Sequence, residues 1–78
     1  MRYPIILEWS GNNFGVYSPD VPGCFAAGDT MEEAKREFQA ALAFHFEGLR
    51  EEGLPIPEPS TAVDYVEVDP LPQSAKAS

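Results

Sequence analysis

Cys24 and His45 are the only thiol and the only imidazole in this chain, so they are the one pair that could support a cysteine nucleophile. Such catalysis needs a thiolate beside an imidazole that accepts its proton. A lone Cys after Pro-Gly is typical of a small buried packing residue, and a His on an apolar helical stripe is typical of a core or interface position. We therefore predict no catalytic residue. A small hydrolase using this pair is kept as an alternative, which requires that alkylation of Cys24 destroys an activity.

Metal and cofactor chemistry find little support in the sequence. A single Cys and a single His can form neither an internal disulfide nor the usual Cys/His zinc cage. Gly23 and Gly28 are separated by apolar residues and lack the Lys-Ser or Lys-Thr of a phosphate-binding loop. The acidic side chains near the expected helix start suit loop and capping roles better than an acid–base or metal cluster; they are Asp20, Asp29, Glu32, Glu33 and Glu37. We predict no metal site and no cofactor.

The charge of the chain favours a basic protein as its partner. Asp and Glu number 13 against 5 Lys and Arg, which gives a net charge of −8 at pH 7. This charge repels phosphate backbones, so we predict no direct nucleic-acid binding, and it attracts a basic partner. The alternative is that it only keeps a small protein soluble. Because neither a signal-peptide run nor a stretch of about 18 apolar residues occurs, we predict a cytoplasmic protein without a membrane partner.

Three short strands are predicted in the first part of the chain. Tyr3, Ile5, Leu7 and Trp9 alternate with other residues, which predicts a strand that buries the face carrying these four side chains. The polar segment Ser10–Asn13 can close a hairpin, and Phe14–Tyr17 resumes the apolar run. The segment Ser18–Gly23 contains two prolines, which predicts a shaped loop. The small and apolar residues of Cys24–Gly28 favour a third strand.

One long helix is predicted to begin at Met31 and to end near Gly53. Thr30 followed by Glu33 matches a capping box, in which the carboxylate reaches back to the Thr30 amide. Gly53 before Leu54 suits a left-handed helix end, and three prolines then prevent continuation. The stripe expected to face the sheet comprises Ala34, Phe38, Ala41, Leu42, His45 and Leu49.

A fourth strand and a tail are predicted after the helix. Thr61–Val68 is rich in β-branched and aromatic residues, and both of its faces are partly apolar. The predicted fold class is α+β with the order β-β-β-α-β, an antiparallel sheet with one long helix on one face. We expect one domain over residues 1–69 and a flexible C-terminal tail over residues 70–78, because a chain this short has room for a single core.

A single helix covers only one side of such a sheet, which leaves apolar side chains for a second copy or a partner. The predicted surface residues are Ile6, Phe44, Phe46, Val66 and Val68. A domain this small that lacks disulfides and metal often relies on association for stability, so we predict a homo-oligomer, a dimer or a tetramer. If Val68 lies in that interface, Val68→Lys should give monomers.

The order and spacing of several short motifs resemble the HicB-type antitoxin domain over the segment from Tyr3 to Ser60. After the hairpin they are Pro19-Asp20-Val21-Pro22-Gly23-Cys24, then Gly28-Asp29-Thr30 with Glu33-Ala34, then Glu52-Gly53-Leu54-Pro55-Ile56-Pro57 with Pro59-Ser60. The resemblance implies a partial ribonuclease-H-like fold without its catalytic carboxylates. Structural roles are expected for the motif residues Pro19, Asp20, Pro22, Gly23, Cys24, Gly28, Thr30, Glu33, Ala34 and Gly53.

The resemblance also implies a function. HicB-type proteins bind and neutralise a small basic toxin of the HicA type, an mRNA-cleaving ribonuclease, by covering its active site. An acidic surface suits this task because it can occupy the place of RNA phosphates. Many HicB antitoxins add a DNA-binding domain, for which the ten residues after Val68 are too few, so we expect a stand-alone short form. The alternative is an orphan homo-oligomeric domain of unknown role that has no toxin partner.

Overall fold

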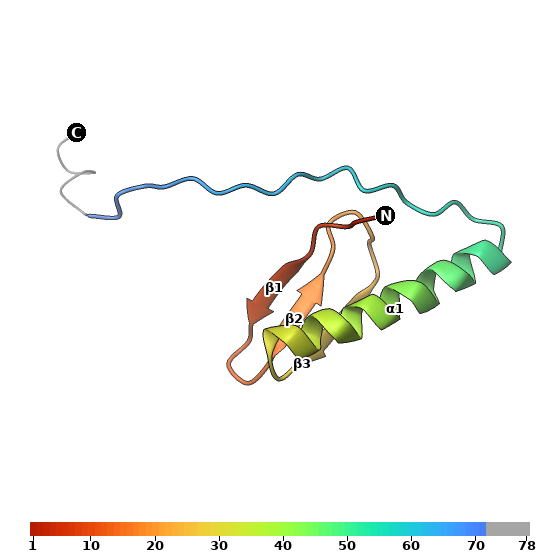
Figure 1. The fold of residues 1–78 in the computed structure, drawn as a ribbon, viewed down its shortest axis with the longest axis horizontal. Coiled ribbons are helices and arrows are strands. Elements are labelled where there is room, and N and C mark those ends of the chain that lie inside the picture. Colours follow the sequence, from red (N-terminus) through yellow and green to blue (C-terminus); the bar gives the residue numbers. More distant parts are fainter. Residues whose placement is uncertain (72–78) are drawn as a thin grey trace.

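The computed structural model describes residues 1–71, which form three strands followed by one helix (Figure 1). The strands are β1 (Ile6–Trp9), β2 (Phe14–Tyr17) and β3 (Phe25–Gly28), and the helix is α1 (Met31–Glu51). The sheet has the order β1-β2-β3, and both neighbouring pairs are antiparallel. The helix packs mainly against β3 and less against β2, so β1 is the strand that α1 covers least. The predicted α+β fold is confirmed up to the end of the helix.

The register of the strands divides their side chains between two faces. Leu7 pairs with Val16, and Val16 pairs with Ala26, so these three side chains share the face that packs on α1. Successive side chains of a strand point to opposite faces. The adjacent cross-strand row therefore lies on the open face of the sheet, and it comprises Ile6, Tyr17 and Phe25.

The core beneath α1 is small and depends on one close approach between backbones. Its buried apolar residues are Val16, Val21, Cys24, Ala34 and Phe38. Ala34 in the first turn of α1 has no exposed area, because the end of β3 lies directly against it. A Cβ atom at Gly28 would stand 2.5 Å from the Ala34 nitrogen and 2.9 Å from the Ala34 Cα. Only a glycine at this position lets strand and helix meet so closely.

Both predicted helix ends are present, with one change in the capping contacts. The Thr30 hydroxyl accepts a hydrogen bond from the Glu33 amide at 3.1 Å, as expected for the N-cap. The Glu33 carboxylate accepts from the Asp29 amide at 2.6 Å, rather than from the amide of Thr30. At the other end, Gly53 has a φ of 73°, and the Leu54 amide donates to a carbonyl of the last turn.

The predicted fourth strand is wrong for the chain as the structure describes it. Thr61–Val68 pairs with no strand, and every residue from 60 to 71 is exposed. Val66 and Val68 were expected on the open face of the sheet, yet they are 90% and 81% exposed on an extended segment. The β-branched composition favours extended backbone, but a strand also needs a neighbour that satisfies its amide and carbonyl groups.

Two aromatic side chains also lie differently from the prediction. Phe46 was expected on the surface but is half-buried, because it packs against Tyr3 with the ring centroids 5.4 Å apart. Trp9 was expected on the buried face of its strand but is 56% exposed. It packs on Phe14 at the end of the hairpin, with the ring centroids 4.9 Å apart.

The chain after α1 consists of an anchored part and an extended part. Residues 52–61, which we call the connector, run back along the domain, and the Tyr3 hydroxyl donates to the Pro57 carbonyl at 2.7 Å. Residues 62–71, which we call the arm, continue past the N-terminus and away from the sheet (Figure 1). The predicted tail at 70–78 lies outside the described residues from 72 onward.

Candidate functional site

Cys24 and His45 line the same pocket between β3 and α1, but the thiol does not have the properties of a nucleophile. The pocket has a volume of about 500 Å³. Cys24 is 6% exposed, and burial raises the pKa of its thiol. Catalytic cysteines need the opposite shift, which supplies thiolate at neutral pH. Cys24 therefore serves as a small apolar side chain of the core.

Two exposed aromatic side chains stand at the edge of this pocket. Phe25 belongs to the open-face row of the sheet, but it starts the edge strand β3 and also lines this pocket, where it is 75% exposed; Phe44 of α1 is 80% exposed. We call this pair the aromatic rim. Large aromatic side chains that remain exposed beside an apolar pocket are typical of surfaces that bind other proteins.

Glutamate side chains flank the aromatic rim. Glu37, Phe44, Glu47 and Glu51 are separated by seven, three and four residues, which places them along one exposed line of α1. Glu52 lines the pocket itself. This flank of the helix therefore combines apolar contact area with negative charge, and it suits a partner that presents basic residues around an apolar patch.

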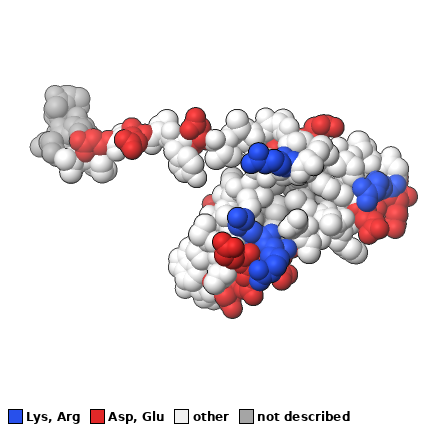
Figure 2. Space-filling view, in the orientation of Figure 1, with Lys and Arg blue, Asp and Glu red and all other residues white. Residues whose placement is uncertain are grey.

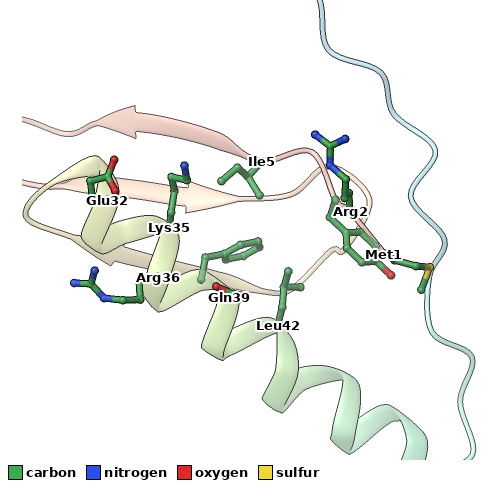
Figure 3. Close-up of a pocket in the computed structure, with 10 residues that line it drawn as sticks. Met1, Arg2, Ile5, Glu32, Lys35, Arg36, Gln39 and Leu42 are labelled. Carbon is green, nitrogen blue, oxygen red and sulfur yellow. The ribbon is translucent and has the colours of Figure 1, made fainter.

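The other flank of α1 forms a groove of about 510 Å³ with the N-terminal residues that lead into β1 (Figure 3). Its apolar lining includes Ile5, Phe38 and Leu42. We call it the basic groove, because three of the five Lys and Arg residues of the chain line it together with one acid; these charged residues are Arg2, Lys35, Arg36 and Glu32. Positive charge is thus concentrated at one place on an otherwise acidic chain.

Asp20 joins the loop between β2 and β3 to the connector, an arrangement that we call the Asp20 clamp. The carboxylate accepts from the amides of Ser60 and Thr61 at 3.1 and 3.2 Å, and from their hydroxyls at 3.2 and 2.7 Å. These bonds, first of all the one from the Thr61 hydroxyl, lower the pKa of Asp20 below its usual 3.8. The clamp fixes the point from which the arm departs.

Sequence reasoning identified Asp20 as a motif residue but missed the partners of its carboxylate. The loop and the connector each matched a motif, yet a single sequence does not show that residues 40 and 41 positions apart meet. The sequence did contain one indication of this contact, because the carboxylate of Asp20 can accept hydrogen bonds from adjacent hydroxyl residues such as Ser60 and Thr61.

The remaining motif residues occupy positions that shape the backbone or fill the core. Gly23 and Gly53 have φ values of 84° and 73°, which other residues rarely adopt. Cys24 and Ala34 are buried, whereas Pro19 and Pro22 are exposed in the loop.

The five predicted surface residues do not form a single surface. Ile6 lies on the open face of the sheet, Phe44 on the aromatic rim, Phe46 against Tyr3, and Val66 and Val68 on the arm. The prediction also missed Tyr17 and Phe25, which are 37% and 75% exposed. The alternation within their short strands could have placed them opposite the buried side chains.

Within residues 1–71, no three His, Cys, Asp or Glu side chains gather where they could hold a metal ion. The one helix of this region is too polar to cross a membrane.

Comparisons with known proteins agree with the fold and the motifs. The model of the family described as HicB_like antitoxin of bacterial toxin-antitoxin system matches residues 3–73. Antitoxin HicB 2 of Photorhabdus laumondii is 41% identical over 69 residues, which cover 87% of this chain and 50% of that protein. An uncharacterised 14.9 kDa protein of Haemophilus phage HP1 is 41% identical over 66 residues, covering 85% of this chain and 50% of that protein.

A solved structure is similar in both fold and sequence. It is described as the HicA3 and HicB3 toxin-antitoxin complex, and it matches with a TM-score of 0.67 and 38% identity. The match covers 77% of this chain and 70% of that chain. The present chain spans about half the length of the curated relatives it matches. Because the family match extends over residues 3–73 and includes every element of the fold, this chain belongs to the HicB-like antitoxin family.

Proposed function

We propose that this chain binds a small basic toxin of the HicA type and neutralises it by covering its RNA-cleaving site. Family membership supports the antitoxin role, and the similar solved structure is a complex that contains a toxin. The observation that carries the proposal on this molecule is the aromatic rim with its flanking glutamates. No comparable concentration of exposed aromatic side chains and acids occurs on the basic groove side of α1 in the described residues.

The rim offers the two kinds of contact that such a complex needs. Phe25 and Phe44 are available to bury apolar area, and aromatic side chains contribute a large share of binding energy at interfaces. The carboxylates of Glu47, Glu51 and Glu52 attract a basic surface and can pair with the Lys and Arg side chains that would otherwise contact RNA phosphates. Binding in this manner competes directly with RNA.

Toxin binding and toxin inhibition test the proposal together. The purified chain is titrated into a HicA-type toxin, with calorimetry for affinity and a labelled transcript for RNA cleavage. We expect cleavage to stop near stoichiometric ratio, and we expect the complex to weaken as ionic strength rises, because salt screens the charge pairs. Full cleavage at a large excess of this chain would refute the proposal.

Single substitutions then locate the interface. Phe44→Ala should weaken toxin binding by about thirty-fold, which corresponds to a hot spot of roughly 2 kcal/mol. Met31→Ala is the matched control, because Met31 is also an exposed apolar residue of α1 at 49% but lies outside the pocket beside the rim. Equal effects of the two substitutions would place the toxin elsewhere, even if inhibition itself is observed.

A further inference from the structure

The arm has the composition of a strand but lies in solvent. Val63, Tyr65, Val66 and Val68 are between 58% and 90% exposed. In extended backbone the first two side chains point to one side and the last two to the other, so both sides of the arm are apolar. A segment of this kind is stable in water when a sheet edge pairs with its backbone and neighbouring side chains cover both of its faces.

The β1 edge offers such a place. β1 pairs with β2 on one side only, which leaves the amides and carbonyls of its other edge without a strand partner in the described residues. The basic groove lies on the α1 side of the residues that lead into β1, and its lining includes Ile5, which directly precedes the strand, and Leu42. On the open face, Ile6 is the side chain next to the edge. A strand added to β1 would therefore find apolar partners on both of its faces.

Length and charge both fit the arm to this edge. The seven residues 62–68 span about 23 Å as a strand, which exceeds the length of the four-residue β1. The arm carries Asp64, Glu67 and Asp69 and no Lys or Arg, and Figure 2 shows acidic side chains along the part that extends from the domain. A basic toxin would be repelled by Arg2, Lys35 and Arg36, whereas an acidic arm is attracted to them.

We propose that two copies of this chain exchange arms, each pairing its residues 62–68 with the free β1 edge and the basic groove of the other. The exchange is reciprocal and has two-fold symmetry, so one kind of contact forms twice. The Asp20 clamp holds Ser60 and Thr61 against their own domain, and beyond it the arm runs away from its own sheet (Figure 1). The anchored connector thus presents the arm to a second copy. The inference does not depend on toxin binding.

Charge reversal in complementary pairs tests this exchange. The groove variant carries Lys35→Glu and Arg36→Glu, and the arm variant carries Asp64→Lys and Glu67→Lys. By light scattering coupled to size exclusion, the wild-type chain should have twice its monomer mass of 8.6 kDa, and each variant alone should be monomeric at the same concentration. An equimolar mixture of the two variants should regain the dimer, because both contacts are then complementary.

Mixing the two variants distinguishes an arm that pairs with a second copy from an arm that folds back onto its own domain. An arm that folds back gives no gain on mixing, and a monomeric wild-type chain at all concentrations contradicts the proposal outright. The matched control is Glu47→Lys with Glu51→Lys, which reverses the same number of charges on the other flank of α1 and leaves the arm and the groove intact. This variant should remain dimeric on its own, and a monomeric control would show that net charge decides association and would overturn the arm-to-groove pairing. A second variant, ending at Thr61, keeps the clamp and should be monomeric.

Discussion

Gly28→Ala should destabilise the fold although alanine is the better residue for an ordinary strand. The φ of Gly28 does not lie in the left-handed region, so the backbone itself accepts alanine. Alanine also lowers the conformational entropy of the unfolded chain, which by itself would stabilise the folded protein by about 0.4–1 kcal/mol. The added Cβ, however, would stand 2.5 Å from the Ala34 nitrogen and 2.9 Å from the carbonyl carbon of Glu33. Both atoms belong to the backbone of the capped helix start, which cannot turn aside as a side chain can.

Overpacking of this kind costs about 1–3 kcal/mol, so the clash outweighs the entropic gain. In a domain of this size each kcal/mol moves the melting temperature by about 4–8 °C, and we expect a decrease of roughly 5–15 °C. Gly48→Ala is the matched control, because nothing lies within 4 Å of its added Cβ and the site is inside α1. There alanine should raise stability by about 0.8–1 kcal/mol through helix propensity.

Thermal unfolding followed by circular dichroism measures both variants, at one protein concentration, because association would otherwise shift the melting temperature. A Gly28→Ala variant that melts at or above the wild-type temperature would show that strand and helix can separate without loss. The close approach of β3 and α1 would then not be what selects glycine at this position.

Three further outcomes follow from particular contacts. The lowered pKa of Asp20 means that the clamp stabilises the fold above pH 3.8 and is lost as the pH falls through the lower folded value, so the protection of the Thr61 amide, taken relative to its intrinsic exchange rate at each pH, should be lost only in acid. Thr61→Ala should move this loss to higher pH, and an unchanged midpoint would contradict the assignment. Native Cys24 should react with iodoacetamide far more slowly than in the denatured chain, because its thiol is buried and its pKa is raised. Thr30→Ala should lower the free energy of unfolding in urea by about 1 kcal/mol, because it removes the N-cap hydroxyl that accepts from the Glu33 amide. Thr30→Ser keeps a hydroxyl and should leave this free energy unchanged.

Elements that depend on local chemistry could be predicted from the sequence. The N-cap at Thr30, the left-handed Gly53 and the hairpin with its polar turn involve residues that are close along the chain. Their signals are therefore contained in short windows of sequence. The shift of the Glu33 carboxylate from the amide of Thr30 to that of Asp29 is the kind of detail that a motif does not specify.

Contacts between distant segments could not be predicted in the same manner. The sequence shows that Thr61–Val68 favours extended backbone, but strand pairing depends on which edge the connector allows it to reach. The Asp20 clamp is a second example, since it determines the course of the chain after Ser60 through hydrogen bonds across 40 residues. Phe46 is a third, because its partner Tyr3 lies before the first strand.

The residues of the candidate site show the same difference between local patterns, which the sequence reveals, and distant contacts, which it does not. Phe44 could be named from the helical pattern because it falls outside the buried stripe, whereas its neighbour Phe25 needed the register of β3. The basic groove had no sequence signal, since Arg2 and Lys35 come to line one groove only after the helix folds over the sheet.

The two proposals use opposite flanks of the same helix, α1, so each proposal can fail in an experiment without the other failing. Arm exchange would occupy the flank with Lys35 and Arg36, and toxin binding would occupy the flank with Phe44 and Glu47. Because the two surfaces do not overlap, an arm-exchanged dimer keeps two free toxin sites related by its two-fold axis. Wild-type protein should then form a complex of two copies with two toxins, and the chain ending at Thr61 should form a one-to-one complex of similar intrinsic affinity. Loss of toxin binding on removal of the arm would instead mean that the arm itself contacts the toxin, which contradicts its assignment to a second copy.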